Sequence, residues 1–397
     1  MKILHITNYY HEGFGYQENF LAHYQQKLGH EVLIVSSDYY FPFKSYEATV
    51  KKILGQRKKG VGVFEDNGVR LIRKKSILSN TRPGFIYFSI ANELNDFKPD
   101  IVHVHGATNF WIFQLVYFQH KLNFKVFIDS HQDFSVENHS SSLINSFYYL
   151  SWSYFHHFLI QSKKVSKYLP ITGQASDWLS WRLKIPKYVQ TISPLGVDLS
   201  SMYYSEEDDF RLRKEWNAED KLVIVNAGKQ YKEKEILLII EIALLLQNRG
   251  IDIFLVLVGD ADELYNNEIK LKLNRLHKNS CARLPFMSRK ELRCIYSASD
   301  IGIWPGIPSN TIQESMACRV ALLLPNNNVV GHLIKSNGIY LSRSVEKTVD
   351  NLCKLISSRG LLSKMKFESE KMANDLSWRV IVNDLVNVYK ANNKGDV

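Results

Sequence analysis

Two lysines stand five residues apart in the second half of the chain, where a strand-like run meets a predicted helix. Val223–Asn226 has the apolar composition of a buried strand, and Gly228 then precedes Lys229, with Lys234 across the following turn. Two cations at such a junction could clamp a diphosphate and stabilise the charge that grows on it as it leaves. A solvated, lysine-rich loop is the alternative that this pattern leaves open.

A second strand–loop–helix junction follows the run Ile301–Trp304. The small polar residues Ser309, Asn310 and Thr311 come just before a predicted helix, so free backbone N–H groups and the helix dipole favour a bound phosphate. Glu314 falls in the first turn of that helix, where a carboxylate also simply complements the dipole. The junction predicts a phosphate site and leaves both roles open for Glu314.

The first half of the chain carries weaker signals. Gly13 and Gly15 follow the first predicted strand, which suits either a plain turn or a close approach of the backbone to a ligand. His103 and His105 lie on a buried strand, and we expect core histidines with satisfied hydrogen bonds rather than ligand contacts. The sequence has no Cys-x-x-Cys pair, and we expect chemistry that uses no metal ion.

The elements that must position these residues alternate along the chain. Short apolar runs, typical of buried parallel strands, are separated by amphipathic stretches of helical length. Between the first two runs, apolar residues recur at helical spacing until Gly29 ends the helix, which makes a βαβ unit. The predicted strands are Ile3–Ile6, Val32–Val35, Ile101–Val104, Val126–Ile128, Val223–Asn226, Phe254–Val258, Ile301–Trp304 and Ala321–Leu324.

Repetition of this unit predicts an α/β fold with two Rossmann-like, doubly wound domains that face a central cleft. A chain of 397 residues is too long for one ordinary core, and the strands restart near Lys221 after the turn Pro194–Gly196. Ligands of such domains bind at the carboxyl ends of the strands. Within the first domain, Glu65–Gly68 predicts a hairpin turn, and Tyr39–Lys59 predicts a mobile loop or excursion.

Composition is that of a globular protein, with 45% apolar and 23% charged residues. The four cysteines form no disulfide framework, which favours a reduced, cytoplasmic compartment. We expect Met1–Thr7 to be a first strand rather than a signal peptide, and polar residues interrupt Ile144–Ile160 too often for a membrane span.

The net charge of +10 is unevenly placed. Residues 1–190 carry 22 Lys and Arg against 14 Asp and Glu, a net charge of +8. The basic residues cluster at 51–52, 57–59, 73–75 and 163–167, the last just after the aromatic stretch Phe147–Phe158. Because the sequence has no nucleic-acid-binding module, we expect phospholipid headgroups or a phosphate-bearing acceptor as the anionic partner. Solvated lysines on an ordinary surface are the alternative.

In the order of these motifs the chain resembles glycosyltransferase family 4, retaining enzymes of the GT-B fold, over nearly its whole length. Gly228, Lys229 and Lys234 match the Gly-Arg and the later Lys with which the family's second domain opens. Glu314–Cys318 matches the second half of the family signature, and Pro194–Asp198 resembles its interdomain segment.

The resemblance implies a role for each candidate residue. Lys229 and Lys234 would stabilise the departing diphosphate, and Glu314 would hydrogen bond the nucleotide ribose. The remaining candidates are the N–H groups of Ser309, Asn310 and Thr311 for the phosphates and the sugar, Gly15 and Gly228 for the diphosphate, Phe286 for the base, and His131 for the donor sugar.

The chain also departs from the family pattern. Gly306 stands where the first signature glutamate, a contact to sugar hydroxyls, is usual, and Lys229 replaces an arginine, which keeps the charge but loses the bidentate fork. Arg319 and Leu195 replace a usual glycine and asparagine. These departures leave room for a chain that binds a nucleotide sugar yet transfers it poorly.

The sequence thus predicts domains over residues 1–194 and 195–376 and a helix over 377–397 that returns to the first domain. We expect a retaining, metal-independent hexosyltransferase, cytoplasmic or peripheral on the inner face of the membrane. The resemblance implies a UDP- or GDP-linked donor as co-substrate, no other cofactor, and a saccharide acceptor, lipid-linked, in bacterial surface-polysaccharide assembly. A catalytically weak binding subunit and a GT-B sugar-nucleotide epimerase are the alternatives.

Overall fold

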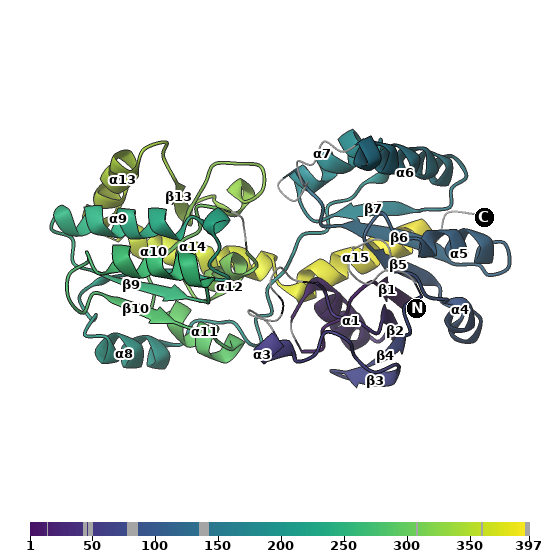
Figure 1. Cartoon of the computed structure of the whole chain (residues 1–397), viewed down its shortest axis with the longest axis horizontal. Helices are drawn as coiled ribbons and strands as arrows, with labels where there is room; N and C mark the ends of the chain where they lie inside the picture. Colours follow the sequence, from purple (N-terminus) through teal and green to yellow (C-terminus); the bar gives the residue numbers. More distant parts are fainter. Residues whose placement is uncertain are drawn as a thin grey trace. The chain divides into compact units, whose positions relative to one another are not determined.

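The computed structural model describes residues 1–13, 15–42, 46, 51–77, 86–134, 143–306, 309–358 and 360–393. The chain divides into two compact units (Figure 1). Unit 1 comprises Met1–Leu195 together with Trp378–Val397, and unit 2 comprises Gly196–Ser377.

A seven-stranded sheet forms the middle layer of unit 1, in the order β3–β4–β2–β1–β5–β6–β7. Neighbouring strands are parallel except for the hairpin of β3 and β4, whose turn at Asn67 and Gly68 has positive φ at both positions, as Glu65–Gly68 predicted. The strands are β1 (Lys2–Thr7), β2 (Glu31–Ser37), β3 (Gly62–Asp66), β4 (Val69–Lys74), β5 (Ile101–His105), β6 (Lys125–Ser130) and β7 (Lys167–Pro170).

Helices cover both faces of this sheet. On one face α1 (Gln17–Lys27) and α15 (Trp378–Asn393) share a core with β1, β5 and β6. The other face is covered by α4 (Ala91–Phe97), α5 (Trp111–Phe118), α6 (Leu143–Gln161) and α7 (Gly173–Arg182). Part of the predicted excursion Tyr39–Lys59 forms α3 (Lys51–Leu54), and its residues 43–45 and 47–50 lie outside the described ranges. The short turn η1 spans Lys187–Val189.

Unit 2 has a six-stranded, wholly parallel sheet in the order β10–β9–β8–β11–β12–β13. Its strands are β8 (Leu222–Ala227), β9 (Ile253–Val258), β10 (Cys281–Leu284), β11 (Ile301–Ile303), β12 (Ala321–Leu324) and β13 (Gly338–Tyr340). Every residue of β8 and β9 is buried, as expected for central strands with helices on both faces.

The helices of unit 2 again form two layers. One face is covered by α8 (Glu206–Glu215), α11 (Arg289–Ser297), α12 (Thr311–Ala317) and α14 (Leu361–Asp375). The other is covered by α9 (Ile236–Asn248), α10 (Glu263–Leu273) and α13 (Val345–Ser357). Single turns η2 (Lys232–Lys234) and η3 (Gly331–Leu333) follow β8 and β12. The α/β class with two Rossmann-like, parallel-sheet domains is thereby confirmed.

No helix within the described ranges has the length and apolar character needed to cross a bilayer.

Candidate active site

The carboxyl ends of β8 and β11 meet at one edge of the unit 2 sheet, and hydrogen bonds fix the loops that follow them. The carbonyl oxygen of Ala227, the last residue of β8, accepts from Trp304 Nε1 at 3.1 Å and from Thr311 Oγ1 at 2.9 Å. Gly228 follows with φ +137°, and a side chain there would come within 3.4 Å of Ser309 Oγ. The predicted residues Gly228, Ser309 and Thr311 therefore lie together.

Lys229 and Lys234 are half-buried on the turn that leaves β8. Burial lowers the pKa of Lys229. Burial, and then the charge of Lys229, lower the pKa of Lys234 to about 8. Two ammonium groups that interact in a partly desolvated place favour an anion beside them. Lys232, in the same turn, is exposed and pairs with Glu268 at 3.1 Å.

Gly306 packs against the turn that carries Lys229 and Lys234, which we call the lysine turn. A Cβ built on Gly306 would overlap the carbonyl oxygen of Glu233, and it would approach the carbonyl carbon of Lys234 to 2.9 Å. The residue that replaces the usual first glutamate is thus the one that lets the loop after β11 touch the turn that carries Lys234. Residues 307 and 308 of that loop lie outside the described ranges.

Glu314 is buried in the first turn of α12 and is paired with Arg289. Arg289 Nη1 lies 2.9 Å from Glu314 Oε1, and Arg289 Nη2 donates to Ser201 Oγ at 3.1 Å. Burial raises the pKa of Glu314, and the charge of Arg289 offsets part of that rise. Our sequence reasoning missed Arg289, although a cation in the first turn of a helix, where it opposes the dipole, hints at an anionic partner elsewhere.

Asn310 and Phe286 complete the predicted donor set in unit 2. Asn310 is the exposed residue before α12. Phe286 follows β10 and is 45% exposed, which leaves an aromatic face available for stacking. The N–H of Gly259, after β9, donates to the carbonyl of Leu284 at 2.9 Å. The loop that carries Phe286 therefore begins at the same carboxyl end of the sheet as Gly228.

Arg319 lies at the opposite end of α12 from this edge. Its φ of +63° explains why glycine is usual there. Its guanidinium pairs with Glu370 at 2.7 Å and lies over the rings of Tyr204 and Phe367, so the substitution is held by contacts within unit 2.

A cavity of about 760 Å³ opens beside the lysine turn. Among the described residues, none of the predicted donor-binding side chains lines it. Its lining is Glu235, Leu238, Pro305, Pro325, Asn326, Leu341, Ser342, Arg343 and Lys347. Glu235 and Pro305 directly adjoin Lys234 and Gly306 in the chain, so the cavity shares a wall with the lysine turn.

Our sequence reasoning overlooked Asp260 and Asp262, which form an Asp-x-Asp sequence after β9. The Asp262 side chain accepts from the N–H of Tyr265 at 3.0 Å and caps α10, which accounts for one of the two carboxylates by helix structure.

In unit 1 the predicted residues also follow strand ends. Gly15 precedes α1 with φ +77°, while Phe14 lies outside the described ranges. His131 is exposed directly after β6. Glu18, in the first turn of α1, was not singled out from the sequence. Burial raises the pKa of Glu18, whereas the nearby His105 and His131 lower it. The Glu18 carboxyl group therefore lies within electrostatic range of both histidines.

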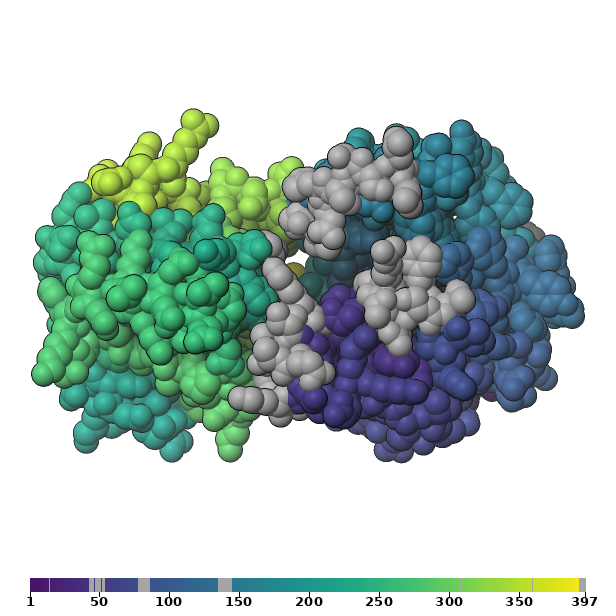
Figure 2. Space-filling view, in the orientation of Figure 1, coloured from purple at the N-terminus to yellow at the C-terminus, as the bar shows by residue number. Residues whose placement is uncertain are grey.

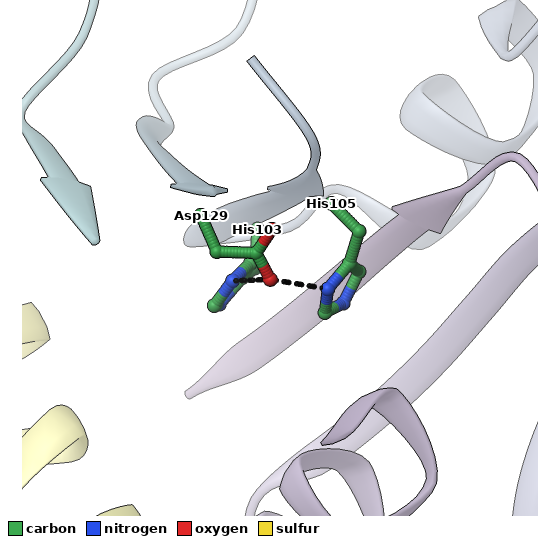
Figure 3. A group of neighbouring side chains, drawn as sticks. All are labelled: His103, His105 and Asp129. Atoms are coloured by element: carbon green, nitrogen blue, oxygen red, sulfur yellow. Dashed lines mark hydrogen bonds and ion pairs between the residues drawn. The ribbon is translucent and has the colours of Figure 1, made fainter. Parts of the chain in front are cut away.

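Beneath them a buried chain of hydrogen bonds crosses the sheet (Figure 3). His103 Nε2 lies 3.3 Å and His105 Nδ1 2.5 Å from the same oxygen of Asp129, whose other oxygen accepts from the N–H of Gly106. His105 Nε2 lies 3.0 Å from His5 Nδ1. The outer ends are capped, because His103 Nδ1 contacts Tyr389 Oη at 2.5 Å and His5 Nε2 contacts Gln25 Oε1 at 2.7 Å.

The partners fix where the protons lie in this chain. His5 Nε2 donates to the amide oxygen of Gln25, so neutral His5 accepts at Nδ1 from His105. His105 also donates to Asp129, which makes it an imidazolium. Burial opposes that charge, but the carboxylates of Asp129 and Glu18 outweigh burial and raise the pKa of His105. The expectation of satisfied core histidines therefore holds for His103 and His105.

His103, His105 and Asp129 also have the atom types of a metal site. Their hydrogen bonds account for all four ring nitrogens without an ion, and the Asp129 oxygen between the rings accepts from both. We interpret the group as a charged core network, which also links α15 to the sheet.

Comparison with known proteins agrees with both units. Residues 20–201 match the family described as Glycosyltransferase Family 4, and residues 208–372 match Glycosyl transferases group 1. No curated protein matches the chain in sequence.

Solved structures share the fold over the whole length. A glycosyltransferase from Rickettsia africae ESF-5 is 17% identical with a TM-score of 0.72, covering 100% of this chain and 99% of that one. Anabaena Alr3699/HepE in complex with UDP is 13% identical with a TM-score of 0.70, covering 98% and 100%. WaaG, a glycosyltransferase involved in lipopolysaccharide biosynthesis, is 11% identical with a TM-score of 0.63, covering 100% of both chains.

Fold and matches together define the chain as a glycosyltransferase of the GT-B class. The two matched segments span most of its length, and the chain belongs to glycosyltransferase family 4.

Proposed function

We propose that the chain is a retaining, metal-independent hexosyltransferase that takes its sugar from a UDP- or GDP-linked donor. The observation that carries this is the pair Lys229 and Lys234, half-buried and mutually repelling at the carboxyl edge of unit 2. A diphosphate beside them would relieve the repulsion. It would also gain most from their charge when the glycosidic bond breaks and negative charge grows on the leaving group.

The other candidates would divide the donor among them. The N–H groups of Ser309, Asn310 and Thr311 and the open backbone at Gly15 and Gly228 would hold the phosphates and the sugar. Glu314, already oriented by Arg289, would bind the ribose, Phe286 would stack on the base, and His131 would position the sugar. The acceptor hydroxyl would attack from the face that the diphosphate leaves, as retention requires.

Two lysines supply the positive charge that a divalent cation provides in other transferases, and this supports a reaction without a metal ion. UDP and UDP-glucose occupy structures of the Anabaena neighbour, and ADP with acarbose occupies that of Arabidopsis starch synthase IV. UDP donors are therefore the first to test.

For the acceptor we propose a lipid-linked saccharide of bacterial surface-polysaccharide assembly, met at the inner face of the membrane from the cytoplasm. The net positive charge of residues 1–190 and the involvement of the neighbour WaaG in lipopolysaccharide biosynthesis support this choice. Nucleic acid is not among the proposed partners.

The test is a donor screen by thermal shift, followed by product analysis with the best donor. Lys229→Ala and Lys234→Ala should each lower turnover on the order of 10²–10³-fold, because each removes a cation from a water-poor site. Lys232→Ala is the matched control, since its side chain is exposed in the same turn, and it should keep turnover within about twofold.

Full activity of Lys229→Ala or Lys234→Ala would refute the diphosphate assignment. Activity that chelation removes and Mg²⁺ or Mn²⁺ restores would refute the metal-independent reaction. Donor binding without any product would favour a binding subunit, and an epimerised nucleotide sugar would favour an epimerase.

A further inference from the structure

The outer surface of α5 and α6 is unusually apolar. Its exposed side chains are Phe113 and Tyr117 on α5 and Phe147, Leu150, Tyr154 and Phe158 on α6, which together we call the aromatic face. Phe147 is 73% and Tyr154 70% exposed. The two helices form an outer layer of unit 1 (teal and blue in Figures 1 and 2).

Helical geometry separates this face from the core. Positions 147, 150, 154 and 158 recur at intervals of three and four residues, so they share one side of α6. Trp152 and Leu159, on the other side, are buried in the core of unit 1. The aromatic face is therefore additional to the buried stripe that holds α6 in place.

The face is continuous across the two helices. The rings of Phe113 and Phe155 lie 4.4 Å apart between centroids, and Phe155 in turn lies 6.4 Å from Phe158. Contiguous exposed apolar surface of this kind marks an interaction site, whereas isolated apolar residues do not.

The charges around the aromatic face indicate what kind of partner it binds. The 19 residues of α6 include no Asp, Glu, Lys or Arg, and no Asp or Glu occurs in 101–128 or 143–176. Those two segments contain Lys121, Lys125, Lys163, Lys164 and Lys167. Aromatic rings on two helices that carry no carboxylate, with lysines in the segments that follow them, match the interface of an anionic lipid bilayer, where rings enter the headgroup region and lysines meet phosphates.

The remaining basic clusters lie elsewhere. Residues 57–59 and 73–75 adjoin β3 and β4, at the edge of the sheet opposite β7, which follows α6. Arg73 is buried and paired with Glu12, and the Arg57 side chain donates to the carbonyl of Tyr40 at 2.9 Å. These clusters do not extend the aromatic face.

We propose that the aromatic face docks unit 1 on an anionic lipid surface. The inference deepens the proposed function, because a lipid-linked acceptor requires the enzyme to work at that surface.

Vesicle co-sedimentation of the full chain tests it, with phosphatidylcholine vesicles that contain or lack phosphatidylglycerol, at low and high salt. Wild type should bind the anionic vesicles reversibly with salt. Phe147→Ser/Tyr154→Ser should lower the partition coefficient about tenfold or more, because two aromatic side chains no longer leave water. The matched control is Leu264→Ser/Leu271→Ser on α10, at 78% and 71% exposure, which should bind as wild type does.

A second pair of variants tests how much the lysines contribute to vesicle binding. Lys163→Glu/Lys164→Glu should weaken binding about tenfold or more, since each change replaces an attraction to the anionic surface by a repulsion. Lys58→Glu/Lys75→Glu, on the opposite sheet edge, should bind as wild type does.

Vesicle binding by Phe147→Ser/Tyr154→Ser at the wild-type level would overturn the proposal. So would a wild-type dimer that this variant converts to a monomer without any vesicle binding, which would assign the face to a second copy of the chain. UDP and GDP binding, measured on the same preparations, reports separately on the proposed function, so either idea can fail alone.

Discussion

At the scale of single residues, Lys229 and Lys234 matter because their environment changes their acid–base behaviour. A buried lysine beside another cation gives up its proton more easily, and the pKa of Lys234 is accordingly lowered to about 8. Its charge is therefore present below pH 8 and lost as the pH rises through that value.

This predicts a descending limb in the pH profile. kcat/KM, which reports on the free enzyme, should fall as the pH rises through about 8, because neutral Lys234 no longer attracts the diphosphate. Lys234→Arg should remove that limb, since arginine stays charged, and Lys232→Arg should leave it in place. Steady-state kinetics with a saturating acceptor measures both, and a wild-type profile flat to pH 9.5 would contradict the role of Lys234.

Which residues the sequence could identify depended on how far apart their partners lie. Lys229 and Lys234 share one turn, so their spacing in the sequence already placed them close together. The pair of Arg289 with Glu314 and the chain from Gln25 through His5 to Asp129 join residues from separate elements. Only the fold brings such groups together, and their proton positions follow from hydrogen-bond partners that no local motif contains.

At the scale of elements, the close packing at Gly306 sets the position of the lysine turn. The backbone of Glu233 and Lys234 occupies the space that a side chain at 306 would need. The position where the family usually has a glutamate is thus one at which this loop geometry leaves no room for a side chain.

We therefore predict that Gly306→Ala is harmful although alanine is small. The added methyl group should displace the turn, destabilise the chain by about 1–3 kcal/mol and lower turnover roughly tenfold. Gly173→Ala is the matched control, because a Cβ there meets nothing within 4 Å and the residue begins α7. Thermal unfolding and kcat report both effects, and identical behaviour of the two variants would refute the packing argument.

The interior strands were predicted from the sequence except β4, which was indicated, together with β3, only by the hairpin turn; the edge strands β7, β10 and β13 were not predicted. β8 and β9 are buried throughout and form clear apolar runs. β7, β10 and β13 lie at sheet edges, and β10 and β13 contain no fully buried residue, so they lack such runs.

At the scale of the whole molecule, α15 completes unit 1 although the rest of that unit comes from the other end of the sequence. Its residues Trp378, Val382, Leu385 and Tyr389 pack on β1, β5 and β6, and Tyr389 also caps the buried histidine chain. Unit 1 is thus built from two segments that the whole of unit 2 separates in sequence.

A chain that ends at Ser377 should keep unit 2 folded and lose cooperative folding of unit 1, because the part of the sheet face that α15 covers would be exposed. Hydrogen exchange measured by mass spectrometry should show protection lost in β1, β5 and β6 and retained in β8 and β9. A chain that ends at Asn393 keeps α15 and serves as the control. Full protection of β1 in the shorter chain would refute this dependence.

The place of α15 in the sequence also sets an order of events on the ribosome. Residues 196–377 must all be made after the strands of unit 1 and before the helix that covers them. At roughly 5–20 residues per second, that interval lasts about 10–40 s. During it the face formed by the newly made β1, β5 and β6 is covered by α1 alone and stays partly exposed, so unit 2 should finish folding first, and the nascent chain should depend on chaperones until its last helix emerges.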